Sequence, residues 1–149
     1  MVELSARKRK QYAEYSPVFW RMADGGSNLQ RTFFDGLIVD PLWICLVHEN
    51  GNDIDGFIMA HVTTAPPVYD PGGKVCVIDD FAVADPSLWP TVGMALQDEA
   101  ERRAIVAGAV ISIIVCGQRD TSKRKALLNS GSEVASEWYV RSIKPNIGS

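Results

Sequence analysis

The chain has 149 residues and a mass of 16.4 kDa, which is the size of one domain. Hydrophobic residues make up 46% and charged residues 22%, a balance that excludes disordered, collagenous and low-complexity proteins. The net charge of −3 gives no overall basic field for nucleic acid or an anionic membrane, and no apolar run approaches the roughly 20 residues that span a bilayer. We therefore expect one domain over residues 1–149, located in the cytoplasm, with no nucleic-acid or membrane partner.

Helical patterns dominate the first forty residues. An amphipathic, basic stretch predicts a helix over 5–15. Ser16-Pro17 then restarts the chain as a short helix through Ala23, because serine can cap a helix and proline suits its first turn. A third helix is expected from Ser27, with its apolar side chains near one face, and the Asp40-Pro41 step ends it.

Strand patterns follow these helices. Strands are predicted over 42–48, 56–64 and 74–83, and the short connections between neighbours favour an antiparallel meander. After Asp85-Pro86 the helical period returns, and it continues as far as Gly108, a residue that suits the end of a helix.

The second half of the chain predicts a parallel pair of strands. A continuous run of β-branched residues over 110–116 is typical of a strand buried on both faces. A strand, a helix and a second strand connected in this way form a right-handed crossover, which makes 74–83 and 110–116 parallel neighbours. A last helix, capped at Asp120 or the next residue, ends at Gly131, and alternation over 134–143 predicts a closing strand. The fold class is therefore α/β (α+β), with a mixed, mostly antiparallel central sheet and flanking helices.

The three cysteines, Cys45, Cys76 and Cys116, each lie in an apolar stretch, and the sequence has no Cys-x-x-Cys motif. Their odd number argues against a disulfide framework, and the two histidines do not complete a zinc pattern. We therefore expect the cysteines to be small buried hydrophobic residues, and we expect no bound metal.

The order of these elements, with Ile78-Asp79-Asp80-Phe81-Ala82-Val83 running through Asp85-Pro86 into a helix, resembles the GNAT family of acyl-CoA-dependent N-acyltransferases. The resemblance covers about residues 42–131. It implies that the 74–83 and 110–116 strands diverge into a V-shaped slot that binds acetyl-CoA as a co-substrate. It further implies an acyltransferase that moves the acetyl group by direct attack to a primary amine, in a small molecule or a peptide.

In that family a loop of pattern Gln/Arg-x-x-Gly-x-Gly/Ala joins the strand to the helix, and its backbone amides bind the pyrophosphate of CoA. The match here is incomplete, because Leu88 replaces Gln or Arg, and Pro90 has no N–H group. A threonine also stands at one glycine of the pattern. The resemblance gives the pyrophosphate role to the amides of Thr91, Val92, Gly93 and Met94. The backbone groups that it assigns to the pantetheine arm and the thioester carbonyl belong to Phe81, Ala82 and Val83.

Asp79 and Asp80 are the candidates for the general base, because an ammonium group must lose its proton before the amine can attack a thioester. Alternation along a strand allows only one of the two to face the slot. At the last helix the resemblance aligns Asp120 with an Asn of the family, as a cofactor-binding residue, and Leu127 with a Tyr that protonates the leaving thiolate. Leucine cannot donate a proton, so Tyr139 on the predicted last strand is the candidate to replace that tyrosine.

Two alternatives stand beside the enzyme. The incomplete loop and Leu127 also fit a catalytically inactive, GNAT-like binding or assembly module, and a homodimer is open in either case. An α/β domain unrelated to this family is the other alternative. A cluster near the start of the last helix would suit the 3′-phosphate of CoA or form a solvated basic face, and it consists of Arg119, Lys123, Arg124 and Lys125.

Overall fold

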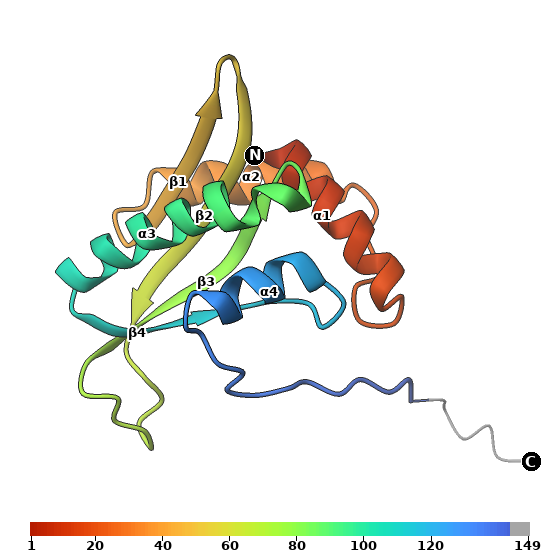
Figure 1. Ribbon diagram of the computed structural model, residues 1–149. Helices are drawn as coiled ribbons and strands as arrows, with labels where there is room; N and C mark the ends of the chain where they lie inside the picture. The colour runs from red at the N-terminus through yellow and green to blue at the C-terminus, as the bar shows by residue number, and fades with distance from the viewer. Residues whose placement is uncertain (144–149) are drawn as a thin grey trace, which may run out of the picture.

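A computed structural model describes residues 1–143, in which helices cover both faces of a mixed four-stranded sheet (Figure 1). In chain order the elements are α1 (Val2–Tyr15), α2 (Gly26–Ile38), β1 (Trp43–Asn50), β2 (Asp53–Thr63), β3 (Lys74–Val83), η1 (Pro86–Leu88), η2 (Trp89–Gly93), α3 (Met94–Val106), β4 (Ala109–Ile114) and α4 (Thr121–Asn129). The predicted fold class is confirmed, and so is the predicted order of elements, with two exceptions given below. No helix in this part of the chain is long and apolar enough to cross a lipid bilayer.

The strands lie in the order β1-β2-β3-β4, with two antiparallel pairs followed by the predicted parallel pair of β3 and β4. The parallel pairing runs from Lys74 opposite Ala109 to Ile78 opposite Ile114. A bond from the Val115 N–H to the Ile78 carbonyl, at 3.0 Å, closes this ladder. Beyond Ile78, β3 continues beside β2 alone. The predicted divergence of the two strands is therefore present, and it opens a slot at their carboxyl ends.

β3 contains one extra residue, Asp79, immediately after the point where β4 leaves it. In β2, Met59 lies opposite Asp80 and the next residue, Ala60, lies opposite Ile78. Asp79 therefore has no partner across the antiparallel pair. Such a bulge inverts the alternation of the side chains that follow it. As a result Ile78 and Phe81, three positions apart, both pack in the core beneath α3.

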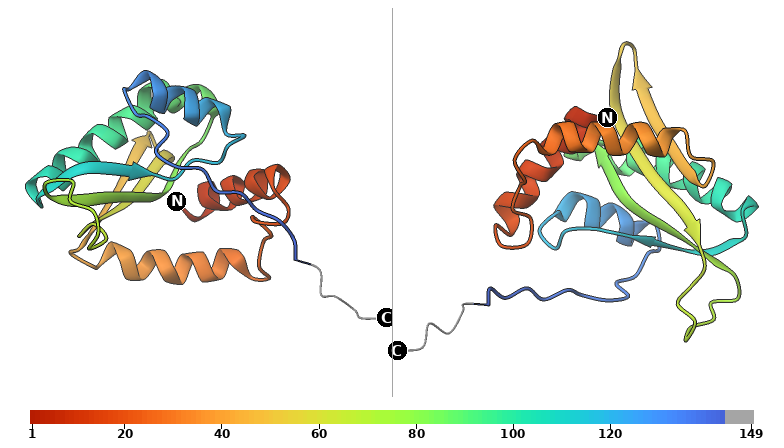
Figure 2. Two further views of the ribbon diagram at one scale, coloured as in Figure 1. Left: turned by 90° about the horizontal axis from the view of Figure 1, so that it is seen from below. Right: turned by 180° about the vertical axis from the view of Figure 1, so that it is seen from behind.

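Two apolar cores lie on the two faces of the sheet, with α3 and α4 on one side and α1 and α2 on the other (Figure 2). The small residues Ala100 and Ala104 of α3 are buried, and they let this helix approach residues such as Ile78 closely. On the opposite face, Leu4 of α1 and Phe34 of α2 are buried in the second core. Both helix layers therefore meet the sheet beside the slot.

The residues between β3 and α3 form helical turns. Pro86–Leu88 is a 3₁₀ turn, Trp89–Gly93 is π-helical, and α3 follows without a break. Asp85 caps the start of this stretch, because its Oδ1 accepts hydrogen bonds from the Ser87 N–H at 2.8 Å and from the Ser87 hydroxyl at 2.6 Å. The segment that the sequence predicts as a phosphate-binding loop is thus already helical.

The short helix predicted over 17–23 is wrong. This segment is a turn followed by irregular chain, in which the Trp20 N–H donates to the Ser16 carbonyl at 2.8 Å. Its aromatic side chains pack on one another and on α1, with ring centroids 4.6 Å apart for Phe19 and Trp20 and 5.2 Å apart for Trp20 and Tyr12. A helix of one turn is too short for added hydrogen bonds to offset the cost of starting it. The aromatic contacts therefore decide the conformation of this segment.

The closing strand predicted over 134–143 is also wrong. These residues have no regular secondary structure, and Val134, Trp138 and Ile143 are exposed. A strand needs a neighbouring strand for its backbone groups, and within residues 1–143 the sheet ends at β4. An alternating pattern is therefore not sufficient here to form a strand.

Candidate active site

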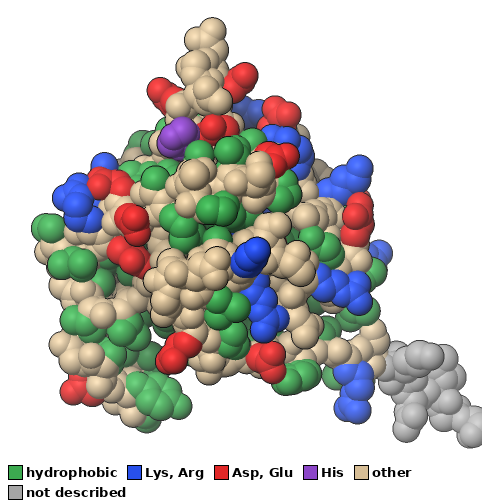
Figure 3. Space-filling view, viewed as in Figure 1, with side chains coloured by type: hydrophobic (Ala, Val, Ile, Leu, Met, Phe, Trp, Pro, Cys, Tyr) green, Lys and Arg blue, Asp and Glu red, His purple; other side chains and the backbone are tan. Residues whose placement is uncertain are grey.

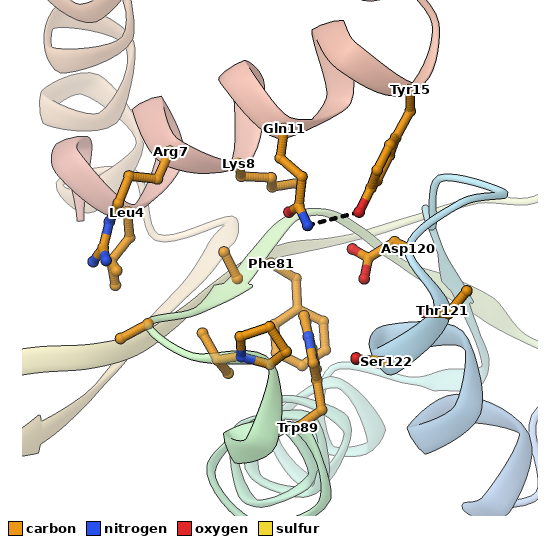
Figure 4. A pocket seen from close by; sticks show the side chains of 14 residues that line it. Leu4, Arg7, Lys8, Gln11, Tyr15, Phe81, Trp89, Asp120, Thr121 and Ser122 are labelled. Atoms are coloured by element: carbon orange, nitrogen blue, oxygen red, sulfur yellow. Dashed lines mark hydrogen bonds between the residues drawn. The ribbon is translucent and has the colours of Figure 1, made fainter.

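A cavity of about 360 Å³ lies where β3 and β4 part (Figure 4). The end of β3 and the helical turns after it form one wall, the start of α4 forms the opposite wall, and α1 covers the top. Its lining residues are Leu4, Arg7, Lys8, Gln11, Tyr15, Phe81, Ala82, Val83, Ala84, Pro86, Trp89, Asp120, Thr121 and Ser122. Among the predicted site residues, the cavity brings together Phe81, Ala82, Val83 and Asp120.

Lys123 of α4 connects the two diverging strands. Its Nζ donates hydrogen bonds to the Val115 carbonyl at 2.8 Å and to the Phe81 carbonyl at 3.3 Å, and it lies 4.9 Å from the centre of the Phe81 ring. The side chain is fully buried, so the interpretation of Lys123 as part of a solvated or phosphate-binding basic face is wrong. Burial, and then the nearby charge of Lys8, lower the pKa of Lys123 to about 7.

A buried pair, Tyr12 and Asp120, joins α1 to the start of α4 beside the cavity, which Asp120 lines. The Tyr12 hydroxyl donates to Asp120 Oδ2 at 2.9 Å and accepts the Gly117 N–H at 3.1 Å. Asp120 Oδ1 accepts the Lys123 N–H at 3.3 Å and so caps α4, as predicted for the start of this helix. Burial and the adjacent carboxylate raise the pKa of Tyr12 well above its usual value, so this hydroxyl remains protonated.

A cation and three carboxylates lie close together under α1. Lys8 lines the cavity, and its Nζ donates to the Asp79 carbonyl at 3.3 Å. Burial lowers the pKa of Lys8, while the carboxylates of Asp80, Asp79 and Asp120 act in the opposite direction. The Tyr15 hydroxyl accepts a hydrogen bond of 2.6 Å from a glutamine on the same helix and points into the cavity (Figure 4). The site therefore contains groups that can both take up and release protons.

The two candidate bases, Asp79 and Asp80, lie beside this cavity and do not line it. Asp79 is exposed on the bulge, whereas Asp80 is half-buried and accepts a bond of 3.4 Å from the Gln30 side chain of α2. The alternation used to separate the two residues is wrong at this pair, because the extra residue interrupts it. Burial and the bond from Gln30 distinguish Asp80 from Asp79 instead.

A second cavity of about 350 Å³ adjoins the first, and the two share Pro86 and Ser122 among their lining residues. It lies between the helical turns after β3 and the length of α4. The remaining lining residues are Ser87, Pro90, Met94, Lys125, Ala126, Asn129 and Ser130. Figure 3 shows Lys and Arg side chains gathered over α4 on the viewed face of the molecule.

No protein-family model and no curated protein matches the sequence. Several solved structures do resemble it. A mutant of the BH1408 protein from Bacillus halodurans has a TM-score of 0.80 at 11% identity, over 96% of this chain and 91% of that chain. A probable acetyltransferase has a TM-score of 0.64 at 15% identity, over 99% and 93% of the two chains. The aminoglycoside N-acetyltransferase AAC(6')-Iy, in complex with CoA, has a TM-score of 0.64 at 13% identity, over 78% of this chain and 87% of that chain. The fold is that of the GNAT acetyltransferases.

The pyrophosphate loop expected of a GNAT fold departs from the prediction. Val92 and Gly93 are buried, and a Cβ atom on Gly93 would lie 2.5 Å from the Trp89 indole, so the missing side chain lets this indole pack against the helix. The Met94 N–H is bonded within the π-helical turn, to the carbonyls of Trp89 and Thr91. Of the four predicted residues, only Met94 lines a cavity.

The acid predicted for the thiolate is not at either cavity. Tyr139 is 88% exposed, and its hydroxyl donates to Glu137 at 2.8 Å. Leu127 is buried in α4, at the place where a GNAT tyrosine was expected. Sequence analysis missed the side chains that α1 contributes to the cavity, although Lys8 and Tyr15 lie seven residues apart, on one face of the predicted helix.

Proposed function

We propose that the protein is an N-acetyltransferase that moves an acetyl group from acetyl-CoA to a primary amine. The observation that carries the proposal is the cavity beside the end of β3, beyond Ile78, where β3 and β4 of a GNAT fold stop pairing. A slot beside the end of a strand suits an extended acyl-carrying arm, because β3 has no strand partner on that side beyond Ile78 and its backbone groups there can bond to the arm. The CoA complex of AAC(6')-Iy, a protein with this fold, supports the choice of donor.

The two adjoining cavities fit the two ends of such a donor. The cavity between the strands would hold the pantetheine arm, and the cavity along α4 would hold the phosphates. Because the backbone amides near Met94 are bonded within the helix, we infer that side chains bind the phosphates, with Lys125, Ser122 and Ser87 in position. Acetyl-CoA supplies an activated acyl group, and the chain supplies orientation and proton transfer.

Phe81 is the residue that we expect to polarise the thioester carbonyl. Its own carbonyl points into the slot, where it accepts the bond from Lys123. In a strand the N–H and the carbonyl of one residue point to the same side, so the Phe81 N–H also faces the slot. A backbone N–H in a site that excludes water stabilises charge that develops on a carbonyl oxygen.

Proton transfer would use carboxylates and a hydroxyl near this point. The acceptor ammonium must lose its proton, and we retain Asp80 as the candidate base of the β3 pair, with Asp120 as a second candidate because its carboxylate lines the cavity. Leu127 offers no acid for the leaving thiolate. The Tyr15 hydroxyl, which points into the cavity, is the group that we infer in that role, in place of Tyr139.

Calorimetry with acetyl-CoA tests the binding step. We expect saturable binding, and Lys125→Glu should weaken it at least about tenfold, because it reverses a charge at the phosphate cavity (about 1.4 kcal/mol). Lys10→Glu is the matched control, since Lys10 is also an exposed lysine and lines neither cavity. Equal affinities for the two variants would place the phosphates elsewhere, and no binding at millimolar acetyl-CoA would overturn the proposal.

Release of free CoA in the presence of a panel of amines tests the transfer itself. If one of the two carboxylates is the base, Asp80→Asn or Asp120→Asn should lower the rate about 10²–10⁴-fold, while Asp79→Asn changes it little. The loss should shrink as the pH rises, because the free amine becomes abundant. Binding of acetyl-CoA without transfer to any amine would favour the alternative, an inactive GNAT-like binding module.

A further inference from the structure

One face of α1 forms a wall of the cavity at the end of β3. The side chains on this face recur at helical spacing and are Leu4, Arg7, Lys8, Gln11 and Tyr15. The helix is fixed to its neighbour, because the Arg9 guanidinium donates to the Gln30 side chain of α2 at 2.8 Å. An anchored helix therefore presents two cations, Arg7 and Lys8, to the cavity, and the proposed chemistry gives neither of them a role.

The two cations differ in the partners that the chain gives them. The Lys8 Nζ donates to the Asp79 carbonyl at 3.3 Å, and the carboxylates of Asp80 and Asp120 lie near enough to offset its charge. Arg7 is exposed, and none of the ion pairs or side-chain hydrogen bonds among residues 1–143 involves it. A guanidinium carries five N–H donors and no acceptor, so the donors of Arg7 remain open to a ligand.

The cavity has two ends of opposite charge. Figure 4 shows Arg7 beside Leu4 at one end, and Asp120 with Tyr15 at the other. Apart from Lys8, the arginine and the aspartate are the only charged side chains among the lining residues. A molecule with one cationic and one anionic group matches this arrangement. A molecule with several cationic groups would instead bring like charge to Arg7, which opposes its binding.

We propose that the acceptor is an amine that also carries a carboxylate or phosphate group, and that Arg7 binds this anionic group. The inference rests on the proposed function, since it assigns the α1 side of the cavity to the acceptor of that acetyl transfer. The planar guanidinium donates two parallel hydrogen bonds to either kind of anion. The ammonium group of the same molecule then faces the candidate bases, Asp80 and Asp120. Arg7 therefore selects the acceptor and takes no part in proton transfer.

The position of Arg7 assigns it to the acceptor and not to the phosphates of the donor. α1 lies on one face of the sheet, whereas the cavity proposed for the phosphates lies along α4, on the other face (Figure 2). Arg7 lines the first cavity and does not line the second. When the donor arm and the acceptor fill the first cavity, they displace water, and the attraction between the guanidinium and an anion becomes stronger.

Pairs of acceptors that differ only in the anionic group test this selection, with release of free CoA as the measure of rate. The probes are glycine, β-alanine and longer ω-amino acids, each beside its amide, and phosphoethanolamine beside ethanolamine. We expect kcat/KM for at least one anionic acceptor to exceed that for its uncharged partner at least about tenfold. A carboxylate raises the pKa of a nearby amine, so the fraction of free amine works against this expectation. A preference confined to phosphoethanolamine identifies phosphate as the anion, and one confined to the amino acids identifies carboxylate.

Substitutions of Arg7 test whether this residue causes the preference. Arg7→Met should lower kcat/KM for the preferred anionic acceptor at least about tenfold more than for its uncharged partner, through a higher KM. Arg7→Lys keeps the charge but loses the paired hydrogen bonds, so its preference should lie between those of the wild type and Arg7→Met. Arg31→Met is the matched control, since Arg31 is exposed on α2 and lines neither cavity. Calorimetry should give Arg7→Met and Arg31→Met the same affinity for acetyl-CoA.

The outcomes separate this inference from the proposed function. Equal rates within every pair, a preference that persists in Arg7→Met, or equal losses for both members of a pair would overturn the role of Arg7, while the observed transfer would still support the acetyltransferase. Weaker binding of acetyl-CoA by Arg7→Met than by Arg31→Met would place Arg7 at the donor and overturn its role as well. If acetyl-CoA does not bind, or if no amine of either kind releases CoA, the proposed function fails and this inference fails with it.

Discussion

Replacement of Lys123 by methionine should change how the stability of the protein depends on pH. The folded-state pKa of Lys123, about 7, lies below its ordinary value of 10.5. Between these two values the unfolded chain binds more protons than the folded one, so the free energy of unfolding rises with pH. From pH 7 to pH 9 the rise attributable to Lys123 is about 2 kcal/mol, because the slope grows from about half of 1.36 kcal/mol per pH unit at pH 7, where the folded group is half protonated, to nearly the full value above it.

The Lys123→Met variant has no ammonium to desolvate, and its curve should lack this rise. It also leaves the carbonyls of Phe81 and Val115 without their donor, at a cost of about 1–3 kcal/mol that does not depend on pH. Lys8 is present in both proteins, so its own titration contributes to both curves.

Urea denaturation at pH 6, 7, 8 and 9 measures this difference. We expect the wild type to gain stability over Lys123→Met by about 2–3 kcal/mol between pH 7 and pH 9. Lys125→Met, which removes an exposed lysine from the same helix, should give a curve parallel to that of the wild type. Parallel curves for wild type and Lys123→Met would refute the reasoning, because the ammonium would then titrate alike in the folded and unfolded chains.

Two further predictions concern packing around the cavity. Gly93→Ala should lower the free energy of unfolding by about 1–3 kcal/mol, because its Cβ meets the Trp89 indole, whereas Gly36→Ala, at an open position of α2, should raise it by up to about 1 kcal/mol. Equal urea midpoints for these two variants would contradict the packing role of Gly93. Tyr12→Phe should cost about 1–3 kcal/mol, because it leaves a buried oxygen of Asp120 without its donor, and a midpoint unchanged by this substitution would show that water replaces the hydroxyl.

Local patterns were sufficient for most of the fold. The sequence predicts β3 with the bounds that the structure gives, because β-branched residues between Asp70-Pro71-Gly72-Gly73 and Asp85-Pro86 leave little freedom for its ends. The parallel pairing of β3 and β4 follows from connection rules. The closing strand could not be predicted in the same way, because the state of 134–143 depends on a neighbouring edge, which the segment does not encode.

The candidate site was predicted less well than the fold. Phe81, for which we propose a backbone role, was predicted at the site from its place on β3, and it lines the cavity. The buried Lys123 was missed because a run of basic residues is usually a solvated surface, and only the divergence of two strands creates partners for an ammonium there. The bulge at Asp79 has no local signal in the sequence. It inverts the alternation of the side chains that follow it on β3, so the face of the sheet to which each one points could not be predicted.

The half-paired state of β3 has a consequence for amide hydrogen exchange. Up to Ile78 this strand lies between two others, and beyond Ile78 it has a strand on one side only. The Phe81 ring is fully buried, yet its amide faces the slot, so this amide should exchange with solvent faster than the burial of the side chain suggests. Packing and ligand contact are thus separate properties of one residue. Substitutions at Phe81 therefore report on the core beneath α3, while the backbone group that we place at the thioester is the same for every amino acid except proline.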